Sequence, residues 1–424
     1  MAKTFSVKTL GCKVNQYESQ ALREKLLEFG LKESKGEPAD ICVVNTCSVT
    51  QKADKESLEA VRQISRDSAG RSRIFVTGCS AQNNRRALES QEGIACVLEN
   101  RRKEDLPSII SGAVADVSSG PSLSITRFHQ RTRAFLKIQD GCDNGCSYCI
   151  IPKLRGPSCS RPLRIITDEA KRLAGHGYRE IVLCGICLGD YGRDLGIRDG
   201  LVKVIEELEE IDGLSRIRLS SIEASDITQA LIDKMARSRK LCRHLHIPFQ
   251  SGDDKVLALM NRKVLSAGYL QLADRLRRHL PDIGITTDIM AGFPGEDQAS
   301  FNNTLRFLKE IKPSRMHIFP FSPRRGTSAF GLLDKVKPQI IRQRVAKLKA
   351  LSKELSLDFC QAQIGRDLNV LIESAPCRKS GFLKGYSGNY LRVYIARIKP
   401  IENTVVMAKA GKVFQDGLLA DVAE

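Results

Sequence analysis

A chain of 424 residues is long enough for two or three domains, each with its own hydrophobic core. It carries 67 basic and 49 acidic residues, and the net charge of +18 suggests a polyanionic partner such as nucleic acid, although a solubilising surface would give the same count. No stretch approaches the length of a membrane span and the first residues form no apolar leader, so we expect a cytoplasmic protein with reduced thiols and no membrane partner.

The amino-terminal part alternates short apolar runs with helical patterns. Runs at 5–10, 40–45 and 74–77 have the composition of strands. A helix should begin with Asn15 as N-cap and Glu18 as capping-box partner, and should end at Gly30. Strands separated by helices predict a parallel sheet with both faces covered.

Cysteines follow these strands at equivalent places. Cys12, Cys47 and Cys79 each lie just beyond the carboxyl end of one strand, which is the edge where open α/β sheets bind ligands. A single cysteine there is more often a core residue. Three of them at matching strand ends predict a shared metal site.

The middle of the chain repeats strand and helix six times after a linker rich in Ser, Gly and Pro at 115–127. One of the helices should begin with Thr167 as N-cap. Six βα units are too few for a closed eight-stranded barrel, so we expect a partial, open barrel with active residues at the carboxyl ends of its strands. The six strands are expected near 135–139, 181–183, 216–219, 244–248, 284–290 and 316–320.

A loop with the spacing C-x3-C-x2-C follows the first of these strands. Cys142, Cys146 and Cys149 could hold three corners of an iron–sulfur cubane and leave one iron open to a substrate or cofactor. Zinc sites usually add a second cysteine pair or histidines, and none follows here. The plain alternative is three buried core cysteines.

The carboxyl-terminal part changes to short alternating strands at 368–372, 391–394 and 404–407, with a turn at 384–389. This pattern predicts a small antiparallel β-barrel. Tyr386 and Tyr390 beside Lys384 and Arg392 could stack on RNA bases and meet phosphates. A hydrophobic hairpin pair with ordinary surface charge is the alternative.

The cysteine loop, with its lead-in Phe135–Cys142, resembles the radical S-adenosylmethionine (SAM) superfamily. Three later motifs, in this order, are similar to its methylthiotransferase branch: Arg218–Glu223, His244–Gly252 and Thr286–Glu296. The resemblance implies an α/β protein with an N-terminal parallel α/β cluster domain at 1–114, a partial (β/α)6 radical SAM barrel at 128–360 and a TRAM-like RNA-binding β-barrel at 361–424.

The same resemblance implies two [4Fe–4S] clusters and SAM as cofactors. Cys12, Cys47 and Cys79 would hold the auxiliary cluster. Tyr148 would contact the adenine of SAM, and four further residues would contact the cofactor through polar groups or close backbone approach: Glu223, Gln250, Gly292 and Gly295. Packing, a Pro-Gly turn or a surface position explains each of these residues equally well, and no catalytic residue is assigned.

The motif Lys8–Tyr17 looks like the branch that acts on N6-threonylcarbamoyladenosine next to the tRNA anticodon. The resemblance then implies insertion of a methylthio group at C2 of that adenosine, with the tRNA anticodon stem-loop and a low-potential electron donor of flavodoxin or ferredoxin type as partners. The same chemistry on isopentenyladenosine or on a ribosomal-protein aspartate is an alternative. An RNA-binding iron–sulfur sensor without turnover is another.

Three positions depart from the family pattern. Cys159 stands where Arg is frequent, and Cys184 and Cys187 stand where Thr and Asn are usual. The C-x2-C pair at a strand end could be an extra metal or redox site, but we expect neutral substitution.

Overall fold

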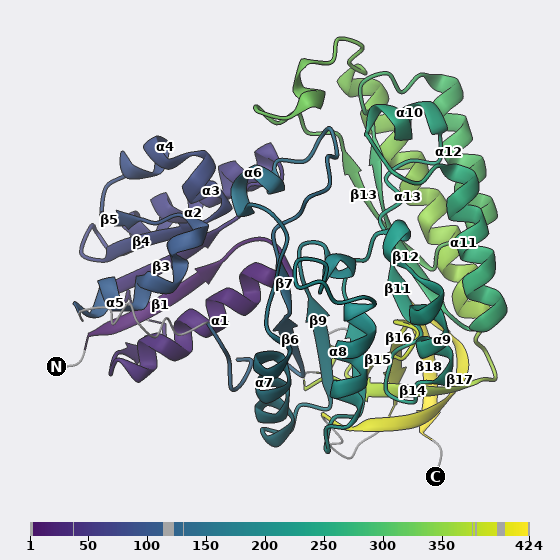
Figure 1. Cartoon of the computed structure of the whole chain (residues 1–424), viewed down its shortest axis with the longest axis horizontal. Helices are drawn as coiled ribbons and strands as arrows, with labels where there is room; N and C mark the ends of the chain where they lie inside the picture. Colours follow the sequence, from purple (N-terminus) through teal and green to yellow (C-terminus); the bar gives the residue numbers. More distant parts are fainter. Residues whose placement is uncertain are drawn as a thin grey trace.

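The computed structural model describes residues 3–36, 38–112, 123–129, 131–374, 376–377, 380–396 and 403–422 (Figure 1). Most of the predicted linker lies outside the described residues, and the predicted domain limits stay predictions. Within the described ranges, no helix combines the length and the apolar character needed to cross a membrane.

The amino-terminal part folds into a five-stranded parallel sheet of order β2-β1-β3-β4-β5, as predicted. Phe5, Val43 and Phe75 belong to the apolar cluster that includes helix α1, whereas Val44 and Val76 pack on the opposite side with α2. Both faces are therefore covered, as a parallel sheet requires. The strands are β1 (Thr4–Thr9), β2 (Lys32–Glu33), β3 (Ile41–Thr46), β4 (Arg73–Gly78) and β5 (Ile94–Val97), and the helices are α1 (Lys13–Glu28), α2 (Gln51–Asp67), α3 (Cys79–Asn83), α4 (Arg85–Glu89) and α5 (Leu106–Ser111).

Helix α1 ends before Gly30 as predicted, but its predicted start is wrong. Cys12 is the N-cap, and Asn15 already lies inside the helix. The Asn15 amide donates to the carbonyls of Leu10 and Thr46, both at 2.8 Å, and Glu18 is buried among cations instead of capping the helix. Long-range partners have overridden the local capping pattern.

All six expected strands of the middle part are present and form a partial barrel. They make two parallel sheets, β10-β9-β6 and β11-β12-β13. Isolated β-bridges join the two sheets, one between residues 217 and 241 and one between residues 221 and 246. No pairing of β6 with β13 is found in the described ranges, so the barrel stays open. The strands are β6 (Arg133–Lys137), β9 (Glu180–Cys184), β10 (Arg216–Leu219), β11 (His244–His246), β12 (Gly284–Ala291) and β13 (Arg315–Pro320).

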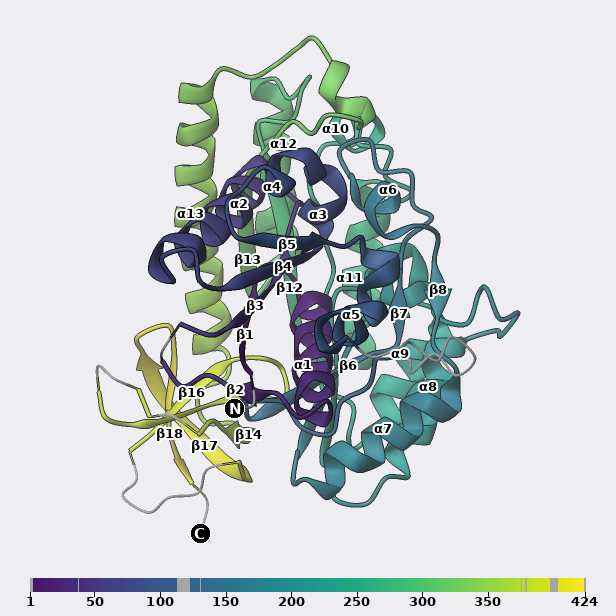
Figure 2. The ribbon, with the colours of Figure 1, turned by 90° about the vertical axis from the view of Figure 1, so that its left-hand side faces the viewer.

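Helices cover the outside of this barrel, and the long α13 lies along β13 (Figures 1 and 2). The predicted start of α7 at Thr167 is wrong, because the helix begins after Pro162 and the Thr167 hydroxyl bonds to the Leu163 carbonyl within it. Proline suits the start of a helix, and an interior threonine often bonds back one turn. The barrel helices are α6 (Ile151–Arg155), α7 (Leu163–Gly175), α8 (Gly200–Glu209), α9 (Gln229–Arg237), α10 (Asp254–Leu259), α11 (Ser266–His279), α12 (Gln298–Ile311) and α13 (Pro338–Gln361), and a short pair of strands, β7 (Gln139–Asp140) and β8 (Cys159–Ser160), lies beside them.

The carboxyl-terminal part is a closed barrel of order β14-β15-β16-β18-β17. Its three predicted strands are confirmed as β14 (Asp367–Ile372), β16 (Arg392–Ile395) and β17 (Val405–Phe414). Two details were wrong. Most of the predicted turn at 384–389 is strand β15 (Leu383–Ser387), and β16 pairs in parallel with β18 (Gly417–Val422), whereas the other pairs are antiparallel.

The turn after β15 docks against the amino-terminal ends of the open barrel's strands. Arg216 donates to the Tyr386 carbonyl at 2.9 Å, and the Arg218 guanidinium lies 4.7 Å from the centre of the Tyr390 ring. Tyr386 is buried and the two tyrosine rings stack on each other, so the prediction that they stack on RNA bases is wrong. Aromatic rings beside cations serve here as an internal cation–π contact.

Candidate metal and cofactor centre

The structure brings Cys12, Cys47 and Cys79 to one edge of the amino-terminal sheet. Cys12 caps α1 after β1, Cys47 follows β3 and Cys79 opens α3 after β4, and these three strands are neighbours. The loops come very close together, because a Cβ atom on Gly11 would lie 2.8 Å from the Cβ of Cys47. Gly11 has φ +99°, which glycine tolerates best.

Hydrogen bonds tie the three cysteine loops to one another. The Asn15 amide holds Leu10 and Thr46, which precede Cys12 and Cys47. The Thr46 hydroxyl accepts a hydrogen bond from the Ser80 N–H at 3.1 Å, directly after Cys79. The loops are thus fixed relative to one another by the protein itself.

The second cysteine loop lies at the carboxyl end of β6, beyond β7. Its turn is tight, since the Asn144 N–H lies 3.3 Å from the Cys142 sulfur and the Cys149 N–H donates to the Cys146 carbonyl at 3.0 Å. Ser147 in the middle of the loop anchors it to the segment after α10, through its N–H to the Met260 carbonyl at 3.0 Å. The predicted position at the strand ends is therefore what the structure shows.

The thiols suit a cluster better than a single ion. Among the described residues, neither cysteine triad belongs to the groups of ligand atoms that lie within 4.8 Å of one another. Burial raises the pKa of Cys47 to about 11 and that of Cys149 to about 12, so these thiols stay protonated until a metal displaces the proton. Soft thiolate donors in sets of three suit an iron–sulfur cluster.

The two triads lie on either side of the short helix α6. Cys79 packs in one apolar cluster with Ile150 and Leu154, which follow Cys149 in the chain. The Asn100 amide spans the same junction, 3.7 Å from the Cys79 sulfur and 3.2 Å from the Leu154 carbonyl. The two cysteine sites therefore share one packed wall.

Arg155 at the end of α6 completes this wall. It is almost fully buried and donates to the Asn15 side-chain oxygen at 2.6 Å, to Glu18 at 3.0 Å and to Asp140 at 2.9 Å. Burial alone would lower the pKa of Arg155, but Glu18 and Asp140 outweigh it and hold the pKa well above its usual value. Sequence reasoning missed this contact, because it gave Asn15 and Glu18 a capping role.

Glu223, a predicted SAM contact, shares a cavity of about 140 Å³ with Cys146 and Arg262. The Arg262 guanidinium pairs with the Glu223 carboxylate and lies 3.6 Å from the Cys146 sulfur. This charged pair at an open cavity next to the cysteine loop suits the charged end of a zwitterionic cofactor. Arg262 was not predicted; it follows Asn261, whose side-chain amide donates to the Gly145 carbonyl of the cysteine loop at 2.7 Å.

The other predicted SAM contacts have structural partners as well. Tyr148 packs edge-on against Phe293 at 6.5 Å between ring centres, and Gln250 has φ +66°, an uncommon backbone for a residue with a side chain. A Cβ on Gly292 would lie 2.4 Å from Ile341, and one on Gly295 would lie 2.7 Å from Leu259. Both glycines thus make room for protein side chains, and contact with SAM stays a prediction for all of these residues.

The three departures from the family pattern differ in their surroundings. Cys187 is buried beside the second cysteine loop, with its sulfur 3.4 Å from the Asn144 amide, and its thiol lowers the pKa of Cys142 through a hydrogen bond. Cys184 is buried at the end of β9, and Cys159 is exposed in β8. Neutral substitution therefore stays a prediction, although Cys187 lies next to a proposed ligand.

A partial barrel of six parallel strands, with a C-x3-C-x2-C loop at their carboxyl ends, defines the radical SAM class of enzymes. Residues 136–308 match the radical SAM superfamily, and residues 4–99 match the family described as Uncharacterized protein family UPF0004. The fold resembles that of the radical SAM methyltransferase TsrM from Kitasatospora setae, with a TM-score of 0.57 and 14% identity over 78% of this chain and 77% of that chain.

Proteins of similar sequence show which family of radical SAM enzymes the chain belongs to. The chain is 35% identical to the threonylcarbamoyladenosine tRNA methylthiotransferase MtaB of Chlamydia pneumoniae, over 99% of this chain and 98% of that protein. It is 36% identical to the protein of the same name in Bacillus subtilis, over 99% and 97%. It is also 35% identical to the tRNA-2-methylthio-N(6)-dimethylallyladenosine synthase of Zymomonas mobilis, over 88% and 86%. The chain therefore belongs to the methylthiotransferase family of radical SAM enzymes, and its cofactors are SAM and [4Fe–4S] clusters.

Proposed function

We propose that this enzyme places a methylthio group on C2 of N6-threonylcarbamoyladenosine, next to the anticodon of tRNA. The support comes from the two relatives named for that reaction, whose alignments cover 99% of this chain. The observation that carries the chemistry is the shared wall at α6, where Cys79 packs beside the residue that follows Cys149.

We assign one cluster to Cys142, Cys146 and Cys149, and the auxiliary cluster to Cys12, Cys47 and Cys79. When bound, these groups and SAM supply radical chemistry and sulfur. The chain's own residues position them. Glu223 and Arg262 line the cavity beside Cys146, and apolar side chains at α6 pack against Cys79.

The partners follow from the reaction and the charge. A net charge of +18 suits the phosphate backbone of an anticodon stem-loop. Reduction of the cluster assigned to Cys142, Cys146 and Cys149 requires a low-potential electron donor, of flavodoxin or ferredoxin type. Exposed cations beside the carboxyl-terminal barrel are candidates for phosphate contact, since Lys349 and Lys353 line a groove of about 460 Å³ there.

The test uses the full chain with its clusters reconstituted without oxygen. The enzyme is incubated with SAM, dithionite and tRNA from a strain that lacks the methylthio step, and the tRNA nucleosides are analysed by mass spectrometry. We expect the methylthio form of threonylcarbamoyladenosine to accumulate and 5′-deoxyadenosine to be released. Unchanged nucleosides with no 5′-deoxyadenosine would instead support an RNA-binding sensor.

A second substrate is favoured by one observation. The identity to the dimethylallyladenosine synthase of Zymomonas mobilis equals that to the first relative, at 35%, although it covers less of both chains. The same nucleoside digest separates the two, because methylthio-dimethylallyladenosine differs in mass. Product on that nucleoside alone would overturn the proposed substrate and leave the chemistry in place.

A further inference from the structure

The inner face of strand β13 is exposed to solvent, and that of β12 is partly exposed at Asp288 and Met290. Along β13 burial alternates: Met316 and Ile318 pack toward the core that includes α13, whereas His317 and Phe319 are exposed. Side chains alternate between the two faces of a strand, so the exposed set lies on the side away from the helices. That side is the interior of the open barrel.

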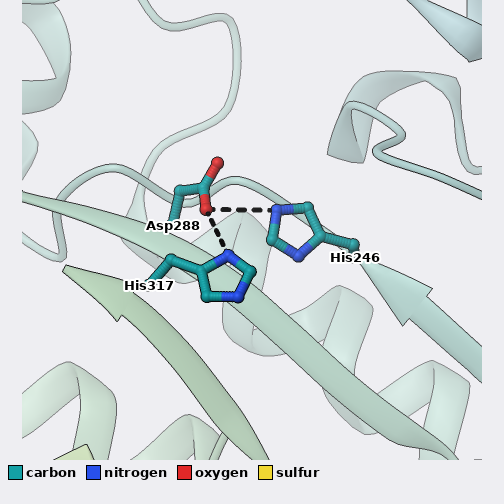
Figure 3. Close-up of side chains that lie close together, drawn as sticks. All are labelled: His246, Asp288 and His317. Carbon is teal, nitrogen blue, oxygen red and sulfur yellow. Dashed lines mark hydrogen bonds and ion pairs between the residues drawn. The ribbon is translucent and has the colours of Figure 1, made fainter. Parts of the chain in front are cut away.

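Three polar side chains gather on this face, one from each strand of the sheet (Figure 3). The Asp288 Oδ1 atom lies 3.3 Å from His246 Nε2 and 3.2 Å from His317 Nδ1. Asp288 and His317 are register partners across β12 and β13. Side-chain exposure rises from 12% at His246 to 26% at Asp288 and 50% at His317, so the group opens toward the edge strand β13.

Each member of this group is held by the others. His246 Nδ1 lies 2.9 Å from the Thr286 hydroxyl, so both nitrogens of its ring have partners. Burial alone would raise the pKa of Asp288, but hydrogen bonds from His246 and His317 hold it well below its usual value. In the part of the chain that the structure describes, no hydrogen bond is found for His317 Nε2.

Among the described residues, His317 Nε2 and the second carboxylate oxygen of Asp288 are thus the polar atoms that the cluster leaves for a ligand, and His317 is the more exposed of the two residues. An imidazole nitrogen accepts a hydrogen bond when the ring is neutral and donates one when the ring is charged. A threonylcarbamoyl group brings a hydroxyl that donates and a carboxylate that accepts. A dimethylallyl group brings only hydrocarbon, which would leave these partly buried polar groups without solvent or partners.

An apolar pair lies next to the cluster, closer to the cysteine loops. Met290 and Phe319 are register partners two residues beyond Asp288 and His317 on the same face, about 7 Å along the strands. Phe319 is 44% exposed, so its ring is available to stack on a base. On adenine, C2 and N6 project from different positions of the ring. A base at Phe319 with C2 directed toward the strand ends can therefore extend its N6 substituent along β13 toward His317.

We infer that His246, Asp288 and His317 form the subsite that recognises the polar substituent on N6 of the target adenosine. This inference rests on the proposed function and names what selects its substrate. Asp288 acts as a positioning residue that fixes both rings, and His317 makes the contact with the threonyl group.

The test measures binding with no electron donor present, so that turnover plays no part. The full chain with reconstituted clusters is titrated without oxygen with anticodon stem-loop RNAs that carry threonylcarbamoyladenosine, dimethylallyladenosine or unmodified adenosine. His317→Phe should weaken binding of the threonylcarbamoyl RNA by about tenfold or more, the usual effect of losing a hydrogen bond to a charged group, and leave the unmodified RNA unchanged. His317→Gln, which keeps a hydrogen-bonding group, should recover part of the loss.

A matched control removes a histidine elsewhere. His279 is exposed on α11, and its ring has a hydrogen bond with the Arg275 carbonyl of the same helix, so His279→Phe should bind all three RNAs like the parent. Asp288→Asn should also weaken the binding of the threonylcarbamoyl RNA selectively, because it loosens the rings of His246 and His317. Circular dichroism and iron content confirm that each variant is folded and loaded.

Three outcomes would overturn the inference. One is that His317→Phe prefers the threonylcarbamoyl RNA over the other two RNAs as strongly as the parent does. The second is equal weakening of all three RNAs. The third is a stoichiometric divalent ion that is lost in His317→Phe, since three ligand atoms within 4.8 Å of one another could also hold a metal. Failure of the proposed function is distinct, because the parent would then not methylthiolate the threonylcarbamoyl RNA at all.

Discussion

Cys79 packs against Ile150, the residue that directly follows Cys149. One cysteine of the amino-terminal sheet therefore packs against the chain neighbour of the last cysteine in the barrel loop. Residues far apart in the sequence form this contact through α3 and α6, which lie side by side. The two cysteine sites belong to one packed unit although they come from different sheets.

Iron content tests whether each triad holds its own cluster. Cys142→Ala and Cys79→Ala should each lower the iron and sulfide of the anaerobically reconstituted protein by about half, because each removes one ligand of one four-iron cluster. Cys159→Ala is the control, since Cys159 is exposed, and should keep the full content. Complete loss of iron in both variants would show a single centre.

Removal of Arg155 should destabilise the protein strongly. Arg155→Met leaves Glu18 and Asp140 with fewer cations in a buried place, and we expect a loss of about 3 kcal/mol in the free energy of unfolding. Arg164→Met is the control. Arg164 is 93% exposed and its ion pair with Asp168 is long, at 3.8 Å, so its removal should cost less than about 0.5 kcal/mol. Denaturant titration followed by circular dichroism measures both, and equal values would contradict the role of the junction.

The Glu180 carboxylate, which pairs with the arginines that hold the carboxyl-terminal barrel, should make the stability of the protein depend on pH. Burial would raise the pKa of Glu180, but Arg216, Arg218 and Arg133 outweigh it and lower the pKa to about 2. The folded state therefore favours the ionised form. This contribution, on the order of 3 kcal/mol, is complete above about pH 4.5 and is lost as the pH falls toward 2.

The measurement compares unfolding of the parent with Glu180→Gln in metal-free protein between pH 7 and pH 3. The stability difference should be largest at pH 7 and should shrink below about pH 4.5. Glu207→Gln, at an exposed position of α8, should show no such trend. A difference that stays constant with pH would mean that the arginines do not depend on the Glu180 charge.

Gly284 at the start of β12 is the tightest point of the docked turn. A Cβ at this position would lie 2.1 Å from the Asn389 carbonyl oxygen, a backbone atom that cannot move aside without moving the turn. Gly284→Ala should cost about 1–3 kcal/mol and speed proteolytic release of the carboxyl-terminal barrel. Gly175→Ala, where a Cβ would meet no atom within 4 Å beyond its chain neighbours and its own helix backbone, should be neutral or slightly stabilising. Equal proteolysis of the two variants would contradict tight docking.

The sequence predicted those features that depend on local periodicity and on general rules of α/β sheets. The parallel amino-terminal sheet, the six strands of the open barrel and the positions of all six cysteines at strand ends follow from alternating strand and helix patterns. Parallel strands point the same way, so residues that follow them meet at one edge even when they are as far apart as Cys12 and Cys79.

The errors have a common physical origin, because local signals were interpreted without their distant partners. Asn15 and Glu18 match a capping box, yet both bond to Arg155, which lies more than a hundred residues away. Tyr386 and Tyr390 beside cations match an RNA-binding surface, yet arginines of the open barrel lie over their rings. His317 was not predicted at all, since a lone histidine in a strand carries no pattern of its own.

The docked turn at 387–390 also limits the side from which an RNA nucleotide can reach the interior of the barrel. Arg218 donates to the carbonyls of Ser387 and Gly388 in that turn, and Arg216 donates to Tyr386 just before it, so the carboxyl-terminal barrel covers the amino-terminal end of β10. A nucleotide that reaches the cysteine loops therefore approaches from the opposite side, at the carboxyl ends of the strands, and the finished nucleotide leaves by that same side. Each round of modification then requires the RNA to withdraw before the next one can begin.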